Sequence, residues 1–167
     1  ETGAPEGGFQ PFGESLEAAL QVAEHAYKRD GQLSGIATDF VDLDNLLGGL
    51  HKSDLIVLAG RPSMGKTALA TNVAFNAART RVADSKAGAV VGFFSLEMSS
   101  EQLAMRILAE ESGIRSDYIR RGKIKDDDEF VGLVRAGQEL SRVPLFIDDT
   151  AALSVPQLRT RARRLKR

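Results

Sequence analysis

One stretch of the sequence has the residue types and spacing needed to bind a phosphate group. Residues 60–67, GRPSMGKT, match the pattern G-x-x-x-x-G-K-[ST] of a phosphate-binding loop. Gly60 and Gly65 allow the tight turn that exposes backbone N–H groups to phosphate oxygens. Lys66 supplies an ammonium for the β- and γ-phosphates, and Thr67 supplies a hydroxyl ligand for Mg²⁺. The pattern predicts a nucleotide site rather than an ordinary glycine turn beside an exposed lysine.

A carboxylate is the second candidate for chemistry. Glu97 follows the apolar, β-prone segment 89–95, so it stands just beyond the carboxyl end of an expected strand. In that position it can orient or deprotonate the water that attacks a γ-phosphate, or it can simply favour a helix start. Arg106, on the helix that follows, could reach a phosphate or pair with Glu110 one turn further on. Both alternatives stay open for Glu97 and for Arg106.

The loop needs a strand before it and a helix after it. Residues 55–59, LIVLA, form a short apolar run typical of a buried parallel strand, and residues 68–78 are rich in helix formers. The helix directs its free N–H groups and partial positive charge at the same anion. We therefore add the loop and first-turn positions Ser63, Met64 and Ala68 to the predicted nucleotide-binding residues.

Three other charged segments are candidates for metal or nucleic-acid sites. Residues 126–129, DDDE, are read as a capped helix start in preference to a metal site. Asp148 and Asp149 end a third apolar strand, 143–150, but its apolar run is too short to favour a Mg²⁺-binding strand. The basic helix that begins at Ser154 is read as packed with a solvated basic side, with nucleic-acid contact as the alternative.

The remaining elements and the composition set the scale of the protein. The 167 residues carry a formal net charge of −1 and no cysteine, which excludes a disulfide framework and thiol catalysis. No apolar run approaches the roughly 20 residues of a membrane span and no signal peptide is visible, so a cytoplasmic location is expected. Residues 1–13 are expected to be a flexible arm, 14–29 an amphipathic helix, and 39–50 a short helix with Phe40, Leu43, Leu46 and Leu47 on its buried face. Ser99 and Gln102 predict a capping box at the start of a further helix.

Taken together, these motifs resemble one known family. The segments that carry the resemblance are GIATDFVDLD (35–44), GRPSMGKT (60–67), GFFSLEMS (92–99), IRRG (119–122), IDDT (147–150) and the basic tail LRTRARRLKR (158–167). They occur in this order in bacterial replicative DNA helicases of the DnaB family.

The resemblance implies an α/β fold: a RecA-like P-loop NTPase with a mainly parallel sheet flanked by helices, truncated and preceded by an N-terminal linker helix. It implies two parts, residues 1–34 as arm and linker helix and residues 35–167 as a partial ATPase domain. It also implies ATP and Mg²⁺ at Lys66 and Thr67, Glu97 as the catalytic carboxylate, and Arg106 near the nucleotide. The implied partners are single-stranded DNA, primase, a helicase loader, and further copies of the chain in a hexamer joined through the linker helix.

The same resemblance indicates what is missing from the segment. In the family the acidic Mg²⁺ strand, the DNA-binding loops and the arginine finger follow the basic tail, so Asp148 and Asp149 would belong to another strand. We expect the isolated chain to be a poor ATPase and the complete protein to be a helicase. Two alternatives stay open: another RecA-like ATPase, such as a recombination protein, and a non-catalytic oligomerisation module.

Overall fold

The computed structural model describes residues 9, 11–28, 33–84 and 87–166. Along the chain, its elements are α1 (Phe12–Lys28), α2 (Val41–Leu47), α3 (Lys66–Ala83), β1 (Val91–Phe94), α4 (Ser100–Ser112), α5 (Ser116–Arg121), α6 (Asp127–Leu140), β2 (Leu145–Asp148) and α7 (Val155–Leu165). The chain divides into two compact units, Glu1–Ser34 and Gly35–Arg167.

The first unit holds a single described helix, α1, at the place where the sequence predicts one. Its large apolar side chains are exposed, including Leu16 at 47%, Leu20 at 63% and Tyr27 at 89%. Leu16, Leu20 and Tyr27 lie on one apolar stripe of the helix. Because no other described element of this unit covers the stripe, it needs a partner surface to leave water. The side chain of His25 lies outside the described residues.

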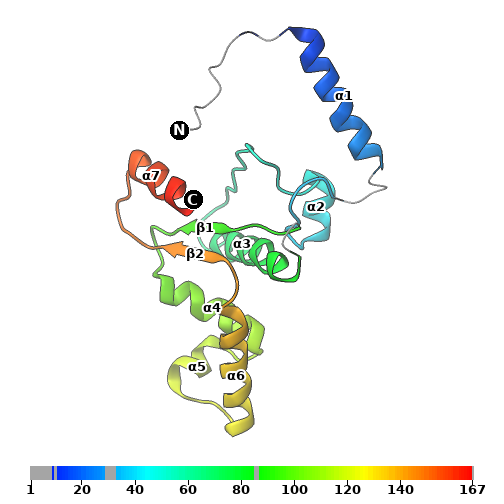
Figure 1. Ribbon diagram of the computed structural model, residues 1–167. Coiled ribbons are helices and arrows are strands. Elements are labelled where there is room, and N and C mark those ends of the chain that lie inside the picture. The colour runs from blue at the N-terminus through cyan, green and yellow to red at the C-terminus, as the bar shows by residue number, and fades with distance from the viewer. Residues whose placement is uncertain (1–8, 10, 29–32, 85–86, 167) are drawn as a thin grey trace. The chain divides into compact units, whose positions relative to one another are not determined.

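The second unit is built on two parallel strands. β1 and β2 pair in register from Val91 with Leu145 to Phe94 with Asp148, and α3 contacts both strands (Figure 1). Parallel strands need a long crossover connection, and here α4, α5 and α6 supply it. The predicted strands at 89–95 and 143–150 are therefore confirmed, each shortened at its ends.

The core of this unit lies among α3, α4 and α6. Phe75 on α3, Leu103 and Ile107 on α4, and Leu133 on α6 are all buried, as is Ile114 in the turn after α4. Helix α4 lies at the centre of this core, because it contacts both α3 and α6. This core packs α3 against α4, the two helices that begin beside the phosphate-binding loop and beside Glu97.

The predicted strand before the phosphate loop is absent from the structure. Residues 55–59 have no regular secondary structure and are exposed, with Leu55 at 89% and Val57 at 79%. A strand is stable only when its backbone N–H and C=O groups are paired. Within the described residues β1 and β2 pair only with each other, so residues 55–59 have no neighbouring strand with which to form a ladder.

Residues 35–50 form a closed turn around a short helix. An antiparallel bridge joins Ile36 to Leu50, and Gly35 and Gly49 lie so close that a Cβ on either would meet the other's backbone at 2.7 Å. The predicted helix is confirmed as α2. The predicted buried face is wrong at Leu46, which is 81% exposed, while the carboxylate of Asp44 is buried instead.

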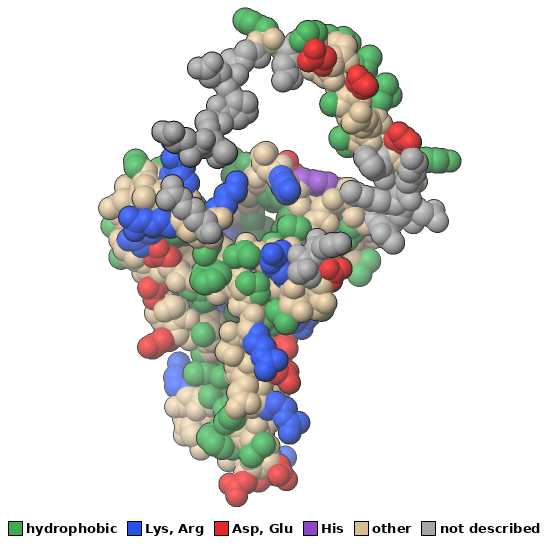
Figure 2. Space-filling model, viewed as in Figure 1, with side chains coloured by type: hydrophobic (Ala, Val, Ile, Leu, Met, Phe, Trp, Pro, Cys, Tyr) green, Lys and Arg blue, Asp and Glu red, His purple; other side chains and the backbone are tan. Residues whose placement is uncertain are grey.

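Helix starts follow the predicted capping chemistry. Ser99 and Gln102 form the capping box of α4, and Ser154 and Gln157 form that of α7. The acidic segment at the start of α6 is a capped first turn, because Asp126 accepts a hydrogen bond from the Glu129 N–H at 2.9 Å. Figure 2 shows Lys and Arg side chains gathered over α7 and Asp and Glu side chains at the tip where α6 begins.

Candidate functional site

The phosphate-binding loop is preformed around two residues in the left-handed backbone region. Ser63 has φ +64° and Gly65, the N-cap of α3, has φ +83°. Successive turns of this kind direct N–H groups to one side and make a concave anion site. No side chain caps the start of α3, so the first N–H groups of this long helix are free for a ligand.

The ammonium of Lys66 lies back over the loop. Its Nζ donates hydrogen bonds to the carbonyl oxygens of Gly60 and Arg61, both at 3.0 Å. An incoming phosphate would displace these neutral acceptors, because it adds the attraction between opposite full charges to the hydrogen bond. Thr67 is half-buried one residue further along the same helix.

A locked turn presents Glu97. The buried hydroxyl of Ser95 donates to the Met98 carbonyl at 2.7 Å and accepts from the Met98 N–H at 3.1 Å. These two bonds close the turn that follows β1, and the capping box of Ser99 starts α4 directly after it. Glu97 is exposed within this closed turn, so its carboxylate is presented to solvent while its backbone is fixed.

One pocket of about 380 Å³ brings the two predicted clusters together. Its lining includes Lys66, Thr67 and Glu97, and the rest comes from Leu58, Ala70, Phe93, Phe94, Ser95 and Leu96. A cation, a hydroxyl and a carboxylate therefore share one cavity beside the carboxyl end of β1. This is the arrangement that phosphate hydrolysis needs: a grip on the anion opposite a group that can activate water.

The other predicted nucleotide-binding residues lie outside that pocket's lining. Gly60, Ser63, Met64, Gly65 and Ala68 belong to the loop and the first turn of α3, where their contribution would come from the backbone.

Arg106 is not brought to the nucleotide pocket. It lines a separate pocket of about 630 Å³ with Met98, Glu101, Met105 and Arg120, among others. In the described part of the chain it has no hydrogen bond or ion pair, so the alternative pairing with Glu110 does not form either. Its placement near a nucleotide remains a prediction without support from this geometry.

The two aspartates at the end of β2 have structural partners. Arg161 donates to both carboxylate oxygens of Asp148, at 2.7 and 2.5 Å, and together with Thr150 it lowers the pKa of Asp148 to about 2. The backbone N–H of Ser100 donates to Asp149 at 2.8 Å and lowers the pKa of that carboxyl. Asp148 therefore ties β2 to α7, and Asp149 ties β2 to the start of α4.

Neither a metal cluster nor a membrane-spanning helix occurs among the described residues. They contain no group of three or more His, Asp or Glu side chains arranged to hold a metal ion. None of their helices combines the length and the apolar character needed to cross a membrane.

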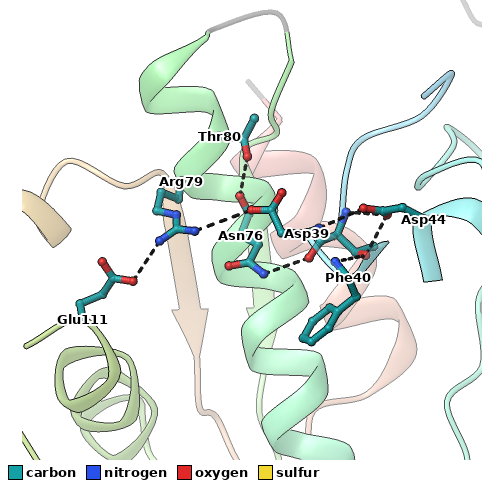
Figure 3. Close-up of polar contacts among 8 residues, drawn as sticks. Asp39, Phe40, Asp44, Asn76, Arg79, Thr80 and Glu111 are labelled. Carbon is teal, nitrogen blue, oxygen red and sulfur yellow. Dashed lines mark hydrogen bonds and ion pairs between the residues drawn. The ribbon is translucent and has the colours of Figure 1, made fainter. Parts of the chain in front are cut away.

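A polar network that no sequence motif marks joins the segment before α2 to α3 (Figure 3). The buried carboxylate of Asp44 accepts hydrogen bonds from the Thr38 N–H and hydroxyl, both at 2.8 Å, and from the Asp39 N–H at 3.1 Å. Asn76 on α3 donates to the Thr38 carbonyl at 2.9 Å. Asp44 is one of two aspartates in the short helix α2, and no motif in the sequence distinguishes it from Asp42. The turn-closing role of Ser95 is not marked by a motif either.

Comparison with known proteins gives consistent matches. The family model described as the DnaB-like helicase C terminal domain matches residues 35–167. The chain is 46% identical to the replicative DNA helicase DnaB of Rickettsia conorii, covering 99% of the chain and 34% of that protein. It is 40% identical to the replicative DNA helicase DnaB of Geobacillus stearothermophilus, covering 96% of the chain and 34% of that protein. The chain thus spans about a third of the length of these curated relatives.

Two solved structures share the fold. A structure described as an ATPase domain superposes with a TM-score of 0.78 at 28% identity, covering 90% of this chain and 51% of that one. A DnaB-like replicative helicase, described with its interactions with primase, superposes with a TM-score of 0.76 at 27% identity, covering 99% of this chain and 37% of that one.

Proposed function

The chain belongs to the family of DnaB-like helicase C-terminal domains, and from that premise we propose that it is the nucleotide-binding part of a replicative helicase motor. The family resemblance and the RecA-like fold expected from the sequence are both confirmed. The complete protein would couple ATP hydrolysis to movement along single-stranded DNA and to unwinding of the duplex. The alternative of a recombination-type ATPase gains no support from these matches.

The observation that carries the proposal is the shared pocket of Lys66, Thr67 and Glu97. A binding module that never hydrolyses its nucleotide needs the cation and the helix N-terminus. It has no need for an exposed carboxylate held opposite them by a locked turn. The pocket therefore favours hydrolysis over nucleotide binding alone.

Each residue would have a distinct task. Lys66 would exchange its two loop carbonyls for phosphate oxygens, and the N–H groups at the start of α3 would bind the same phosphates. Glu97 would accept a proton from the attacking water. Ser95 would keep Glu97 in place through its two bonds to Met98.

The donor set also fits a magnesium ion. The Thr67 hydroxyl is a hard oxygen ligand on the wall of the pocket, and Mg²⁺ takes few protein ligands besides phosphate oxygens and water. When bound, Mg²⁺ would neutralise charge on the phosphates. Thr67 would hold it and would not take part in proton transfer.

The partners are proposed at the level of the complete protein. Single-stranded DNA is the proposed track, and copies of the chain are proposed to associate through α1 into a hexamer. Contacts with primase and with a helicase loader are proposed for parts of the protein outside this segment. One structural neighbour is described with primase, which supports the first of these contacts.

The direct test is nucleotide binding and turnover by the complete protein. We expect saturable binding of labelled ATP in the presence of Mg²⁺, with loss of both binding and hydrolysis in Lys66→Ala, because the helix N-terminus alone lacks a cation for the γ-phosphate. The isolated 167-residue chain should bind nucleotide but turn it over slowly.

Two results would contradict this proposal. Absence of saturable ATP binding in the complete protein would remove the nucleotide site. Binding that persists unchanged in Lys66→Ala would show that the loop is an ordinary turn. Turnover by the isolated chain at the rate of the complete protein, abolished by Lys66→Ala, would contradict only the expectation of low activity for the segment.

A further inference from the structure

A charge bridge joins the far ends of the two helices that hold the candidate site. Arg79, near the end of α3, forms an ion pair with Glu111 at 3.0 Å, near the end of α4. The same guanidinium lies 3.7 Å from Asp39, and it stacks 5.3 Å from the centre of the Phe75 ring. Figure 3 shows Arg79 between the two carboxylates.

Asp39 is held in place for this contact. Its backbone has φ +62°, a left-handed conformation that is uncommon for residues other than glycine. The buried Asp44 carboxylate accepts its N–H, and Asn76 binds the neighbouring Thr38 carbonyl. The segment before α2 is therefore attached to α3 at two places, Asn76 and Arg79. Arg79 also links this segment to α4, through its ion pair with Glu111.

The bridge lies at the opposite end of both helices from the chemistry. At a rise of ~1.5 Å per residue, Arg79 is roughly 20 Å along α3 from Lys66, and Glu111 is a similar distance from the turn that carries Glu97. The two helices meet the pocket with their N-terminal ends. A tilt of about 3° between them about the bridged end would change the separation of the N-terminal ends by about 1 Å, a displacement that can cost about 10²-fold in rate.

We propose that Arg79 is a positioning residue: by bridging Asp39 and Glu111 it sets the angle between α3 and α4, and thereby the distance from Lys66 and Thr67 to Glu97. This inference rests on the hydrolytic function proposed above. Nucleotide is gripped from the α3 side alone, whereas hydrolysis needs both sides at the correct separation. Loss of the bridge therefore lowers the rate of hydrolysis and leaves nucleotide affinity nearly unchanged.

The energetics distinguish positioning from a contribution to stability. Arg79 and Asp39 are both about half exposed as side chains, and exposed ion pairs add little to the free energy of unfolding. The core beneath the bridge, with Phe75 and Leu103 buried, holds the fold together without it. An effect on turnover much larger than the effect on thermal stability is the signature of a positioning role.

The test uses Arg79→Gln, Glu111→Gln and the double variant in the complete protein, with Arg79→Lys as the conservative substitution. Arg135→Gln is the control, because Arg135 is an exposed arginine on α6 without a partner among the described residues. We expect kcat for ATP to fall about tenfold in Arg79→Gln with the Kd for ATP within about twofold of the wild type. Arg79→Lys should retain most of the rate, and the double variant should be no slower than Arg79→Gln alone.

Several outcomes would overturn the inference. They are an unchanged kcat in Arg79→Gln, additive losses in the double variant, or a parallel fall of kcat, nucleotide affinity and melting temperature. If the wild type hydrolyses ATP in a Lys66-dependent manner and Arg79→Gln does so equally fast, the positioning role fails and the proposed function stands. If the wild type shows no such hydrolysis, both fail together.

Discussion

At the residue scale, the groups proposed to bind nucleotide and the group proposed to activate water lie on two different elements. Lys66 and Thr67 lie at the start of α3, and Glu97 lies in the turn before α4. Both groups line the same pocket, and no hydrogen bond joins Lys66 to Glu97 within the described residues. Substitution of Glu97 should therefore lower hydrolysis and spare nucleotide binding, whereas substitution of Lys66 should remove binding and hydrolysis together.

Glu97→Gln in the complete protein should separate the two functions. The amide keeps the size of the side chain and cannot accept the proton of the attacking water, so we expect hydrolysis to fall by about 10²-fold or more. Nucleotide affinity, measured by titration with labelled ATP, should stay within about threefold of the wild-type value, because the phosphates are gripped from α3. Glu101→Gln is the matched control, because that exposed carboxylate lines the neighbouring pocket. Equal losses of binding and turnover in Glu97→Gln would make Glu97 a structural residue.

Sequence reasoning at this scale identified helix caps, which are confirmed, and candidate site residues, whose roles stay predictions, where short motifs carry them. The phosphate loop, the position of Glu97 and both capping boxes depend on neighbours within a few residues. Residues that are close in the sequence are also close in space there, so the sequence shows which groups meet. Arg106, Arg79 and Asp44 depend on segments that fold back from elsewhere. Nothing in the sequence beside Arg79 indicates that its partner is Glu111.

At the element scale, helices were predicted better than strands for a physical reason. A helix such as α4 satisfies its backbone groups within itself, and Ser99 and Gly113 mark its ends locally. A strand depends on a neighbour that the sequence does not identify. Residues 55–59 have the composition of a buried strand, yet they remain unpaired because no partner strand lies beside them in the described structure.

The contact between β2 and α7 should depend on pH through Asp148. Its pKa is lowered to about 2 because Arg161 and then Thr150 donate hydrogen bonds to the ionised carboxylate. A carboxyl whose pKa is lower in the folded state stabilises the fold above its unfolded pKa of roughly 4, and that contribution disappears as the pH falls toward 2. The difference in unfolding free energy between the wild-type chain and Asp148→Asn should therefore shrink over this interval.

Denaturant titrations at a series of pH values measure this difference. Asp54→Asn is a suitable control, since Asp54 is exposed and its side chain has no partner among the described residues. The control variant should track the wild type at every pH. A difference between wild type and Asp148→Asn that stays constant from about pH 5 to about pH 2 would show that the Arg161 pair does not contribute through charge.

At the scale of the whole molecule, the two units differ in how their apolar surface is covered. The unit from Gly35 to Arg167 has a buried core among α3, α4 and α6, although other apolar side chains of that unit are exposed, whereas no described side chain of α1 is buried and Phe12, Leu20 and Val22 are 78%, 63% and 70% exposed. Side chains of this size on one helix need a covering surface. A neighbouring copy of the chain and the chain's own second unit are the two candidates for that surface.

Association in solution decides between these candidates. If α1 docks on a neighbouring copy, the mass measured by light scattering should rise with protein concentration and rise further with ATP and Mg²⁺. The variant Leu16→Glu with Leu20→Glu should then remain monomeric, because charging the stripe places carboxylates in an apolar contact where each would be costly to desolvate. Gln21→Glu changes the charge at an exposed position of the same helix outside the stripe and should associate as the wild type does.

If α1 instead packs on the second unit of its own chain, the wild type and the stripe variant will both be monomeric, and the stripe variant will be the less stable of the two. That outcome would leave the phosphate pocket untouched and would remove α1 from the proposed assembly, because the pocket lies wholly within the second unit.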